Sequence, residues 1–137
     1  MKKIEHIGIA VKDLKSAEKI YAALFGEQPY KRETVASEGV TTSFFKAGLN
    51  KIELLEATDE HSPIAKYLSK NREGIHHIAF EVEDIESEMI RLKQEGFVLL
   101  NDKPKKGADN KLVCFIHPKT ANGVLIELCQ EIKESKL

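Results

Sequence analysis

Two stretches of this sequence repeat each other in the same order, and this internal repeat constrains the fold more than any other feature. IEHIGIAVKDL (4–14) aligns with IHHIAFEVEDI (75–85) at a shift of 71 residues. KIELLE (51–56) aligns with LIELCQ (125–130) at a shift of 74 residues. Because the two matches keep their order and have nearly equal shifts, we predict two modules, at about residues 1–60 and 75–131, within a single domain spanning 1–137.

Each module is predicted to run strand, helix, then two or three strands. Both open with the apolar alternation of a half-buried strand, and Asp13 and Asp84 then stand where a helix N-cap belongs. Helical spacing follows and stops at Gly26 and Gly96. Between the modules, Ser62-Pro63 predicts a short helix through Leu68. The further strands are expected at about 40–47, 51–56, 97–100, 111–117 and 123–130.

The repeat places one histidine and one glutamate at equivalent positions in each module. Side chains alternate between the two faces of a strand, and a helix is expected to cover the face with the bulky apolar residues. The opposite face of each opening strand carries a histidine followed by small residues, and the opposite face of each closing strand carries a glutamate. These four residues are His6, Glu53, His77 and Glu127.

These four side chains form a candidate metal site. A lone histidine or glutamate on a strand is usually an ordinary surface or packing residue, so the prediction depends on both types recurring in both modules. If an approximate two-fold axis relates the modules, the four side chains can converge on one point. Two imidazoles and two carboxylates suit a divalent ion such as Zn, Co, Ni, Mn or Fe.

Composition excludes several classes of function. Lys plus Arg number 21 and Asp plus Glu 22, so the formal charge of −1 disfavours nucleic acid or a membrane surface as a partner. No apolar run approaches the roughly 20 residues that span a bilayer, and the N-terminal segment lacks the pattern of a secretory signal. The two cysteines, Cys114 and Cys129, do not form a disulfide scaffold and are expected to be packing residues. We therefore expect a cytoplasmic protein.

The sequence resembles the vicinal oxygen chelate (glyoxalase/bleomycin-resistance) superfamily over nearly its whole length. The resemblance is carried by IEHIGIAVKDL, by SPIAKYLSKNREGIHHIAFEVEDI and especially by HPKTANGVLIELCQ (117–130), which resembles the methylmalonyl-CoA epimerases within that superfamily. It implies an α+β fold of two βαβββ modules in tandem around a metal-containing cavity. It also implies a divalent metal cofactor (Co, Zn, Ni, Mn or Mg) held by His6, Glu53, His77 and Glu127, an acyl-CoA substrate and a homodimer.

The implied reaction removes the C2 proton of methylmalonyl-CoA and returns a proton to the opposite face. Such a reaction needs an acid/base on each face of the planar enolate, and we expect Glu127 and Glu53 in these roles. Some epimerases of this kind carry an acid where this chain has Thr41 and Thr42, so that acid is not available here. The lysines that could meet the CoA phosphates are Lys103, Lys105, Lys106 and Lys119.

Three other functions are compatible with the same fold. Glyoxalase I uses the same ligand set on a glutathione hemithioacetal, and Glu53 favours it slightly, whereas the HPK and GVLIEL segments disfavour it. A metal-free drug-binding module has no need of four ligand positions. A dioxygenase needs a coordination position open for oxygen, which Glu53 would occupy.

Overall fold

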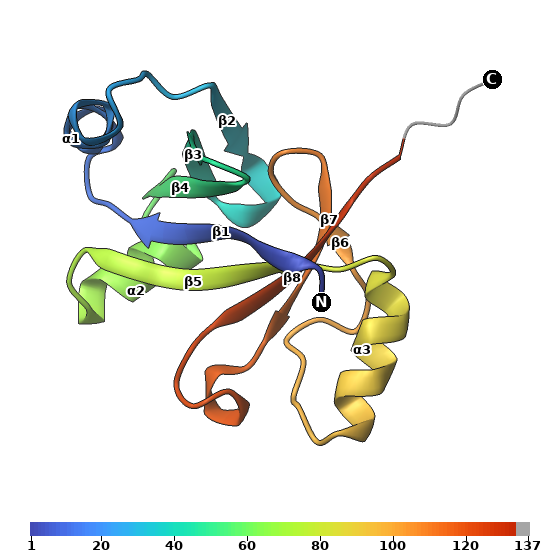
Figure 1. The fold of residues 1–137 in the computed structure, drawn as a ribbon. Coiled ribbons are helices and arrows are strands. Elements are labelled where there is room, and N and C mark those ends of the chain that lie inside the picture. The colour runs from blue at the N-terminus through green and yellow to red at the C-terminus, as the bar shows by residue number, and fades with distance from the viewer. Residues whose placement is uncertain (134–137) are drawn as a thin grey trace. The chain divides into compact units, whose positions relative to one another are not determined.

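The computed structural model describes residues 1–133, and within them it contains three α-helices and eight β-strands (Figure 1). The chain divides into two compact units: an N-terminal unit of His6–His76, and a C-terminal unit of Met1–Glu5 together with His77–Leu137. The helices are α1 (Leu14–Phe25), α2 (Pro63–Lys70) and α3 (Ile85–Gln94). The strands are β1 (Lys3–Ala10), β2 (Lys31–Val35), β3 (Val40–Ala47), β4 (Asn50–Ala57), β5 (Gly74–Glu81), β6 (Lys105–Lys106), β7 (Lys111–Ile116) and β8 (Ile126–Glu131).

In the N-terminal unit, which contains β1 from His6 onward, the strands lie in the order β2-β3-β4-β1, with β1 parallel to β4. Helix α1 packs against β3 and β4 and covers one face of these strands. Its N-cap is Asp13, whose side chain accepts a hydrogen bond from the Lys15 N–H at 3.1 Å, and its C-cap is Gly26 in the left-handed conformation (φ 71°). The core beneath it contains Val11, Leu14, Ala17, Phe45 and Leu54.

In the C-terminal unit the strands lie in the order β5-β8-β7-β6, with β5 parallel to β8. Helix α3 packs against β7 and β8, and its N-cap Asp84 accepts from the Ser87 N–H at 3.2 Å. The core beneath this helix contains Val82, Ile85, Met89, Leu92, Cys114, Ile116 and Leu128. The apolar residues at the end of each opening strand thus pack under the helix that follows it, Ile9 and Val11 under α1 and Val82 under α3.

The two units have the same strand register at their centres. In β1 and β4, Gly8 pairs with Glu53, and in β5 and β8, Ala79 pairs with Glu127. The bond from the Val11 N–H to the Leu55 carbonyl and the bond from the Val82 N–H to the Cys129 carbonyl both measure 2.9 Å. The order of elements, β1-α1-β2-β3-β4 followed by β5-α3-β6-β7-β8, confirms the predicted α+β class and the two βαβββ modules.

The strands of the structure differ from the expected ones in three places. Strand β2 is present although the sequence does not predict it. Residues 97–100 make only a single bridge, Leu99 to Ile116, because Phe97 and Leu99 pack onto the core under α3, and the short β6 takes the place of that strand. Strand β8 begins at residue 126 and not at 123, since Asn122 and Gly123 adopt left-handed conformations (φ 55° and 84°) in the preceding turn.

The predicted linker helix is confirmed as α2. The hydroxyl of Ser62 caps it by accepting a hydrogen bond from the Ala65 N–H at 3.1 Å, and Pro63 occupies its first turn. Through residue 133, the helices are all too short or too polar to traverse a bilayer.

Candidate metal centre

The N-terminal unit brings His6 and Glu53 together. His6 lies in β1 and Glu53 lies in the neighbouring β4, on the face that α1 does not cover. The distance from His6 Nε2 to Glu53 Oε1 is 3.4 Å, and only 6% and 5% of the two side chains are exposed. The pairing follows from the parallel β1–β4 register, which sets Glu53 opposite Gly8, where the absence of a side chain leaves room.

The C-terminal unit brings His77 and Glu127 together in the same way. His77 lies in β5 and Glu127 in the parallel β8, and the distance from His77 Nε2 to Glu127 Oε1 is 3.6 Å. These side chains are 3% and 8% exposed. Each predicted histidine therefore lies beside the glutamate of its own module.

Burial of these groups has a free-energy cost that a structural role alone does not explain. A buried carboxylate is strongly destabilising unless it is paired, and replacing a buried ionic pair with apolar residues is often neutral or stabilising. The fold instead keeps an imidazole nitrogen and a carboxylate oxygen close together, twice, on strands that are otherwise rich in apolar residues. Both atom types are ligands for borderline divalent ions. Metal binding by the four residues stays a prediction.

Two phenylalanines that the sequence analysis did not single out lie beside these pairs. In the β3–β4 ladder Phe44 is directly opposite Glu53, and in the β7–β8 ladder Phe115 is directly opposite Glu127. The repeat carried a signal for them, because the shift of 71 residues that aligns His6 with His77 also aligns Phe44 with Phe115.

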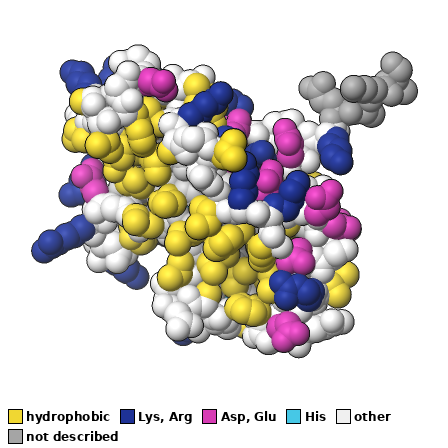
Figure 2. Space-filling model, viewed as in Figure 1, with side chains coloured by type: hydrophobic (Ala, Val, Ile, Leu, Met, Phe, Trp, Pro, Cys, Tyr) yellow, Lys and Arg dark blue, Asp and Glu magenta, His cyan; other side chains and the backbone are white. Residues whose placement is uncertain are grey.

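The four lysines proposed to face an anionic substrate all lie in the C-terminal unit. Lys105 and Lys106 form β6, and Lys119 lies in a 3-10 turn (Pro118–Thr120). Lys105 Nζ lies 6.0 Å from the centroid of the Phe115 ring, which places this lysine beside the residue opposite Glu127. On the face drawn in Figure 2, basic side chains are interspersed with acidic ones.

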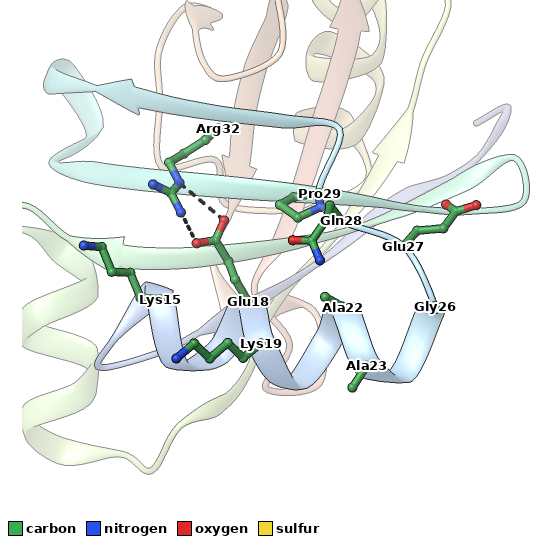
Figure 3. A pocket seen from close by; sticks show the side chains of 10 residues that line it. All are labelled: Lys15, Glu18, Lys19, Ala22, Ala23, Gly26, Glu27, Gln28, Pro29 and Arg32. Carbon is green, nitrogen blue, oxygen red and sulfur yellow. Dashed lines mark hydrogen bonds and ion pairs between the residues drawn. The ribbon is translucent and has the colours of Figure 1, made fainter.

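A hollow of about 670 Å³ lies in the N-terminal unit between α1 and the start of β2 (Figure 3), and none of the four predicted ligands lines it. At its wall Glu18 accepts hydrogen bonds from the Arg32 guanidinium and, at 2.7 Å, from the Ser43 hydroxyl. These bonds tie α1 to β2 and β3. We interpret this cluster as a structural connection that holds the helix on the strands.

The two cysteines are free and buried. Burial raises the pKa of the Cys114 thiol. Burial also raises the pKa of Cys129, and the negative charges of Glu127 and Glu5 raise it further. A thiol that stays protonated is a poor nucleophile, which agrees with the expected packing role.

Comparison with known proteins identifies one matching family model and several similar enzymes. Residues 5–115 match the family model described as the Glyoxalase/Bleomycin resistance protein/Dioxygenase superfamily. The chain is 45% identical to the ethylmalonyl-CoA/methylmalonyl-CoA epimerase of Cereibacter sphaeroides over 130 residues, which cover 93% of this chain and 97% of that protein. It is 39% identical to the human mitochondrial methylmalonyl-CoA epimerase over 129 residues, covering 93% of this chain and 73% of that one.

Among solved structures, the fold is similar to that of a Streptomyces coelicolor methylmalonyl-CoA epimerase in complex with 2-nitronate-propionyl-CoA. The TM-score is 0.93 at 34% sequence identity, and the match covers 97% of this chain and 99% of that chain.

Proposed function

The chain belongs to the Glyoxalase/Bleomycin resistance protein/Dioxygenase superfamily, and within it we propose that the chain is an isomerase that epimerises methylmalonyl-CoA at C2. The epimerase names of the relatives and of the similar structure support this reaction over that of glyoxalase I. The observation that carries the proposal is the matched geometry of the two His–Glu pairs, with Nε2–Oε1 distances of 3.4 and 3.6 Å at equivalent positions of the repeat.

We propose that His6, Glu53, His77 and Glu127 hold one divalent cation, with Co, Zn, Ni, Mn and Mg as the candidates. The donor set fits such an ion, since it offers two imidazole nitrogens and two carboxylate oxygens from buried side chains. When bound, the ion would supply positive charge that stabilises the negative charge developing on the thioester oxygen. Each unit holds only half of this ligand set, so we infer that the two units act together as one domain.

Proton transfer at C2 is assigned to the two glutamates. Glu127 removes or returns the proton on one face of the substrate, and Glu53 does so on the opposite face, as inversion requires. Their burial excludes bulk water from the carboxylates. Thr41 and Thr42 cannot replace either base, because a threonine hydroxyl is not basic, and Thr42 Oγ1 already donates to the Glu33 carbonyl at 3.4 Å.

Substrate binding, assembly and location follow from the same proposal. Lys105, beside Phe115, would attract the phosphates of the CoA moiety together with Lys103, Lys106 and Lys119. We also infer a cytoplasmic homodimer, and light scattering of the purified protein tests the assembly.

The reaction can be tested by proton NMR of methylmalonyl-CoA in deuterated water, with cobalt-loaded protein and a metal-stripped control. We expect loss of the C2 proton signal and interconversion of the epimers in the cobalt-loaded sample alone. Absence of exchange at verified metal occupancy would contradict the epimerase function and direct the next assay to a glutathione hemithioacetal. Failure to bind metal at all would favour a non-catalytic binding module.

A further inference from the structure

Each carboxylate of the proposed site has a phenylalanine directly opposite it on the neighbouring antiparallel strand. Phe44 faces Glu53 across β3 and β4, and Phe115 faces Glu127 across β7 and β8. Residues opposite each other in an antiparallel ladder project to the same face, with Cβ atoms about 4.5–5.5 Å apart. Both rings therefore lie on the ligand-bearing face, each beside one carboxylate.

In the C-terminal unit the phenylalanine opposite the glutamate also contacts the histidine of the pair. The Phe115 ring meets the His77 imidazole edge-on, with ring centroids 5.9 Å apart and an interplanar angle of 86°. This T-shaped arrangement is a favoured geometry for two aromatic rings. Phe115 thus packs against the His77 ring and lies opposite Glu127 in the strand ladder, next to both members of the pair.

In the N-terminal unit, Phe44 is buried and packs against a second aromatic ring, that of Tyr30. Only 1% of Phe44 is exposed, and its ring packs against Tyr30 with centroids 6.0 Å apart. The Tyr30 N–H also donates to the Phe44 carbonyl at 2.9 Å, and Lys46 Nζ lies 5.2 Å from the Tyr30 ring centroid. A ring held in this way presents a rigid apolar surface to Glu53.

We propose that Phe44 and Phe115 are a matched pair of positioning residues, each holding the glutamate opposite it in the orientation in which it binds the metal; this inference rests on the proposed metal site. The terminal torsion of a glutamate side chain is broad, so the backbone alone does not fix the carboxylate plane. Hydrogen-bonding groups that orient metal ligands typically change metal affinity by about 10–100-fold when they are removed, and a packing ring that orients a ligand should act in the same direction.

The variants Phe44→Leu and Phe115→Leu test the inference, since leucine keeps an apolar side chain but lacks the flat ring. Each has a matched control. Phe45→Leu alters the adjacent residue, equally buried but packed under α1 on the opposite face, and Phe97→Leu alters a half-buried ring packed against the α3 core. The readouts are the dissociation constant for Co²⁺, the visible absorption spectrum of the cobalt-loaded protein and the thermal unfolding midpoint of the metal-free protein.

We expect at least a tenfold weaker affinity for cobalt and a changed spectrum for Phe44→Leu and Phe115→Leu, with the two controls equal to the parent protein. Phe115→Tyr, which keeps the ring, should bind cobalt with the affinity of the parent protein. If Phe44→Leu unfolds, Phe44→Met takes its place, because the unbranched methionine side chain adapts better to the space that the ring leaves. Affinities and spectra equal to those of the parent protein, or an equal loss in the controls, would overturn the inference.

The outcomes separate this inference from the proposed reaction. A parent protein that binds cobalt without exchanging the C2 proton contradicts the reaction, yet the cobalt measurements still decide the role of the rings. A parent protein that epimerises the substrate, with cobalt binding unchanged in both ring variants, contradicts the positioning role alone.

Discussion

The backbone N–H of Ile85, at the start of α3, donates a hydrogen bond of 2.8 Å to the side-chain oxygen of Gln130 in β8. The N-terminal unit makes the equivalent bond from the Leu14 N–H, at the start of α1, to Glu56 Oε2 in β4 at 2.7 Å. Glu56 aligns with Gln130 in the repeat. Each bond satisfies one of the free N–H groups at a helix start and ties the helix to the strand that carries the glutamate of the proposed metal site.

Replacing Gln130 with leucine should lower the free energy of unfolding by about 1–2 kcal/mol, because the Ile85 N–H loses its partner in a partly buried position. Urea denaturation measures the change. Gln130→Glu is the matched control, since the other unit makes the same bond with a glutamate, and it should retain most of the stability. Equal stability of Gln130→Leu and the parent protein would show that the bond contributes nothing.

Replacing His77 with alanine should weaken cobalt binding by more than the 10–100-fold that loss of an outer partner typically costs, because one direct ligand is removed. His76→Ala is the control, since the His76 ring packs edge-on against Tyr67, 4.9 Å away, and is not a proposed ligand. Isothermal titration of the metal-stripped proteins gives both affinities. Normal occupancy in His77→Ala would contradict the four-ligand site.

Glu127→Gln and Glu53→Gln should each reduce inversion about 10²–10⁴-fold, the typical contribution of a general acid or base. Glutamine keeps an oxygen but cannot take the C2 proton. Because the opposite base remains in each variant, each should still exchange the C2 proton of one epimer in deuterated water, and the two variants should prefer opposite epimers. Full inversion in either variant would remove that glutamate from the mechanism.

The N-cap aspartates of α1 and α3 should make the stability of the fold depend on pH in the acid range. Hydrogen bonds from Ser16 lower the pKa of Asp13, and hydrogen bonds from Ser87 lower the pKa of Asp84. Carboxyls with a lowered pKa in the folded state stabilise the fold fully above the ordinary aspartate pKa of about 3.9, and this stabilisation is lost as pH falls through the lowered values.

The double variant Asp13→Asn, Asp84→Asn keeps both caps but removes their titration. The parent protein should therefore have a higher thermal midpoint than this variant at pH 6. The difference between the two midpoints should shrink as the pH is lowered to 3. Calorimetry at matched ionic strength measures it. A difference independent of pH would contradict the assignment.

Cys129 should resist thiol reagents in the folded protein, because it is 0% exposed and its thiol has a raised pKa. Labelling with a disulfide reagent at pH 8 should be slow in buffer and rapid in urea. Cys129→Ala, which leaves only Cys114, distinguishes the two thiols. Fast labelling of Cys129 under native conditions would show that the strand opens readily.

The sequence predicted the first and last strands of each module well, because each combines a clear alternation with a repeat partner. The first and last strands of a module pair with each other, which places each histidine beside the glutamate of its own module. The order of elements also follows from the repeat. Strand β2 could not be found in the same way, because its sequence KRETV is short and charged, as is typical of an edge strand.

The positions of Phe44 and Phe115 depend on which residues face each other across β3–β4 and β7–β8. Periodicity assigns a residue to a face but does not fix the register between two strands, and a slip of two residues would move each ring away from its glutamate. The repeat could have identified both rings as equivalent, but not as neighbours of Glu53 and Glu127.

The equal register of β1–β4 and β5–β8 has a consequence for the origin of the chain. A single module sequence, placed twice in tandem, would by itself generate two His–Glu pairs on two identical backbone frames, before any difference between the halves had arisen. Duplication of one short gene would thus double the number of His–Glu pairs in one step. The present differences between the two modules, such as Glu56 in one and Gln130 in the other, would then have arisen after the duplication, while the strand register stayed the same.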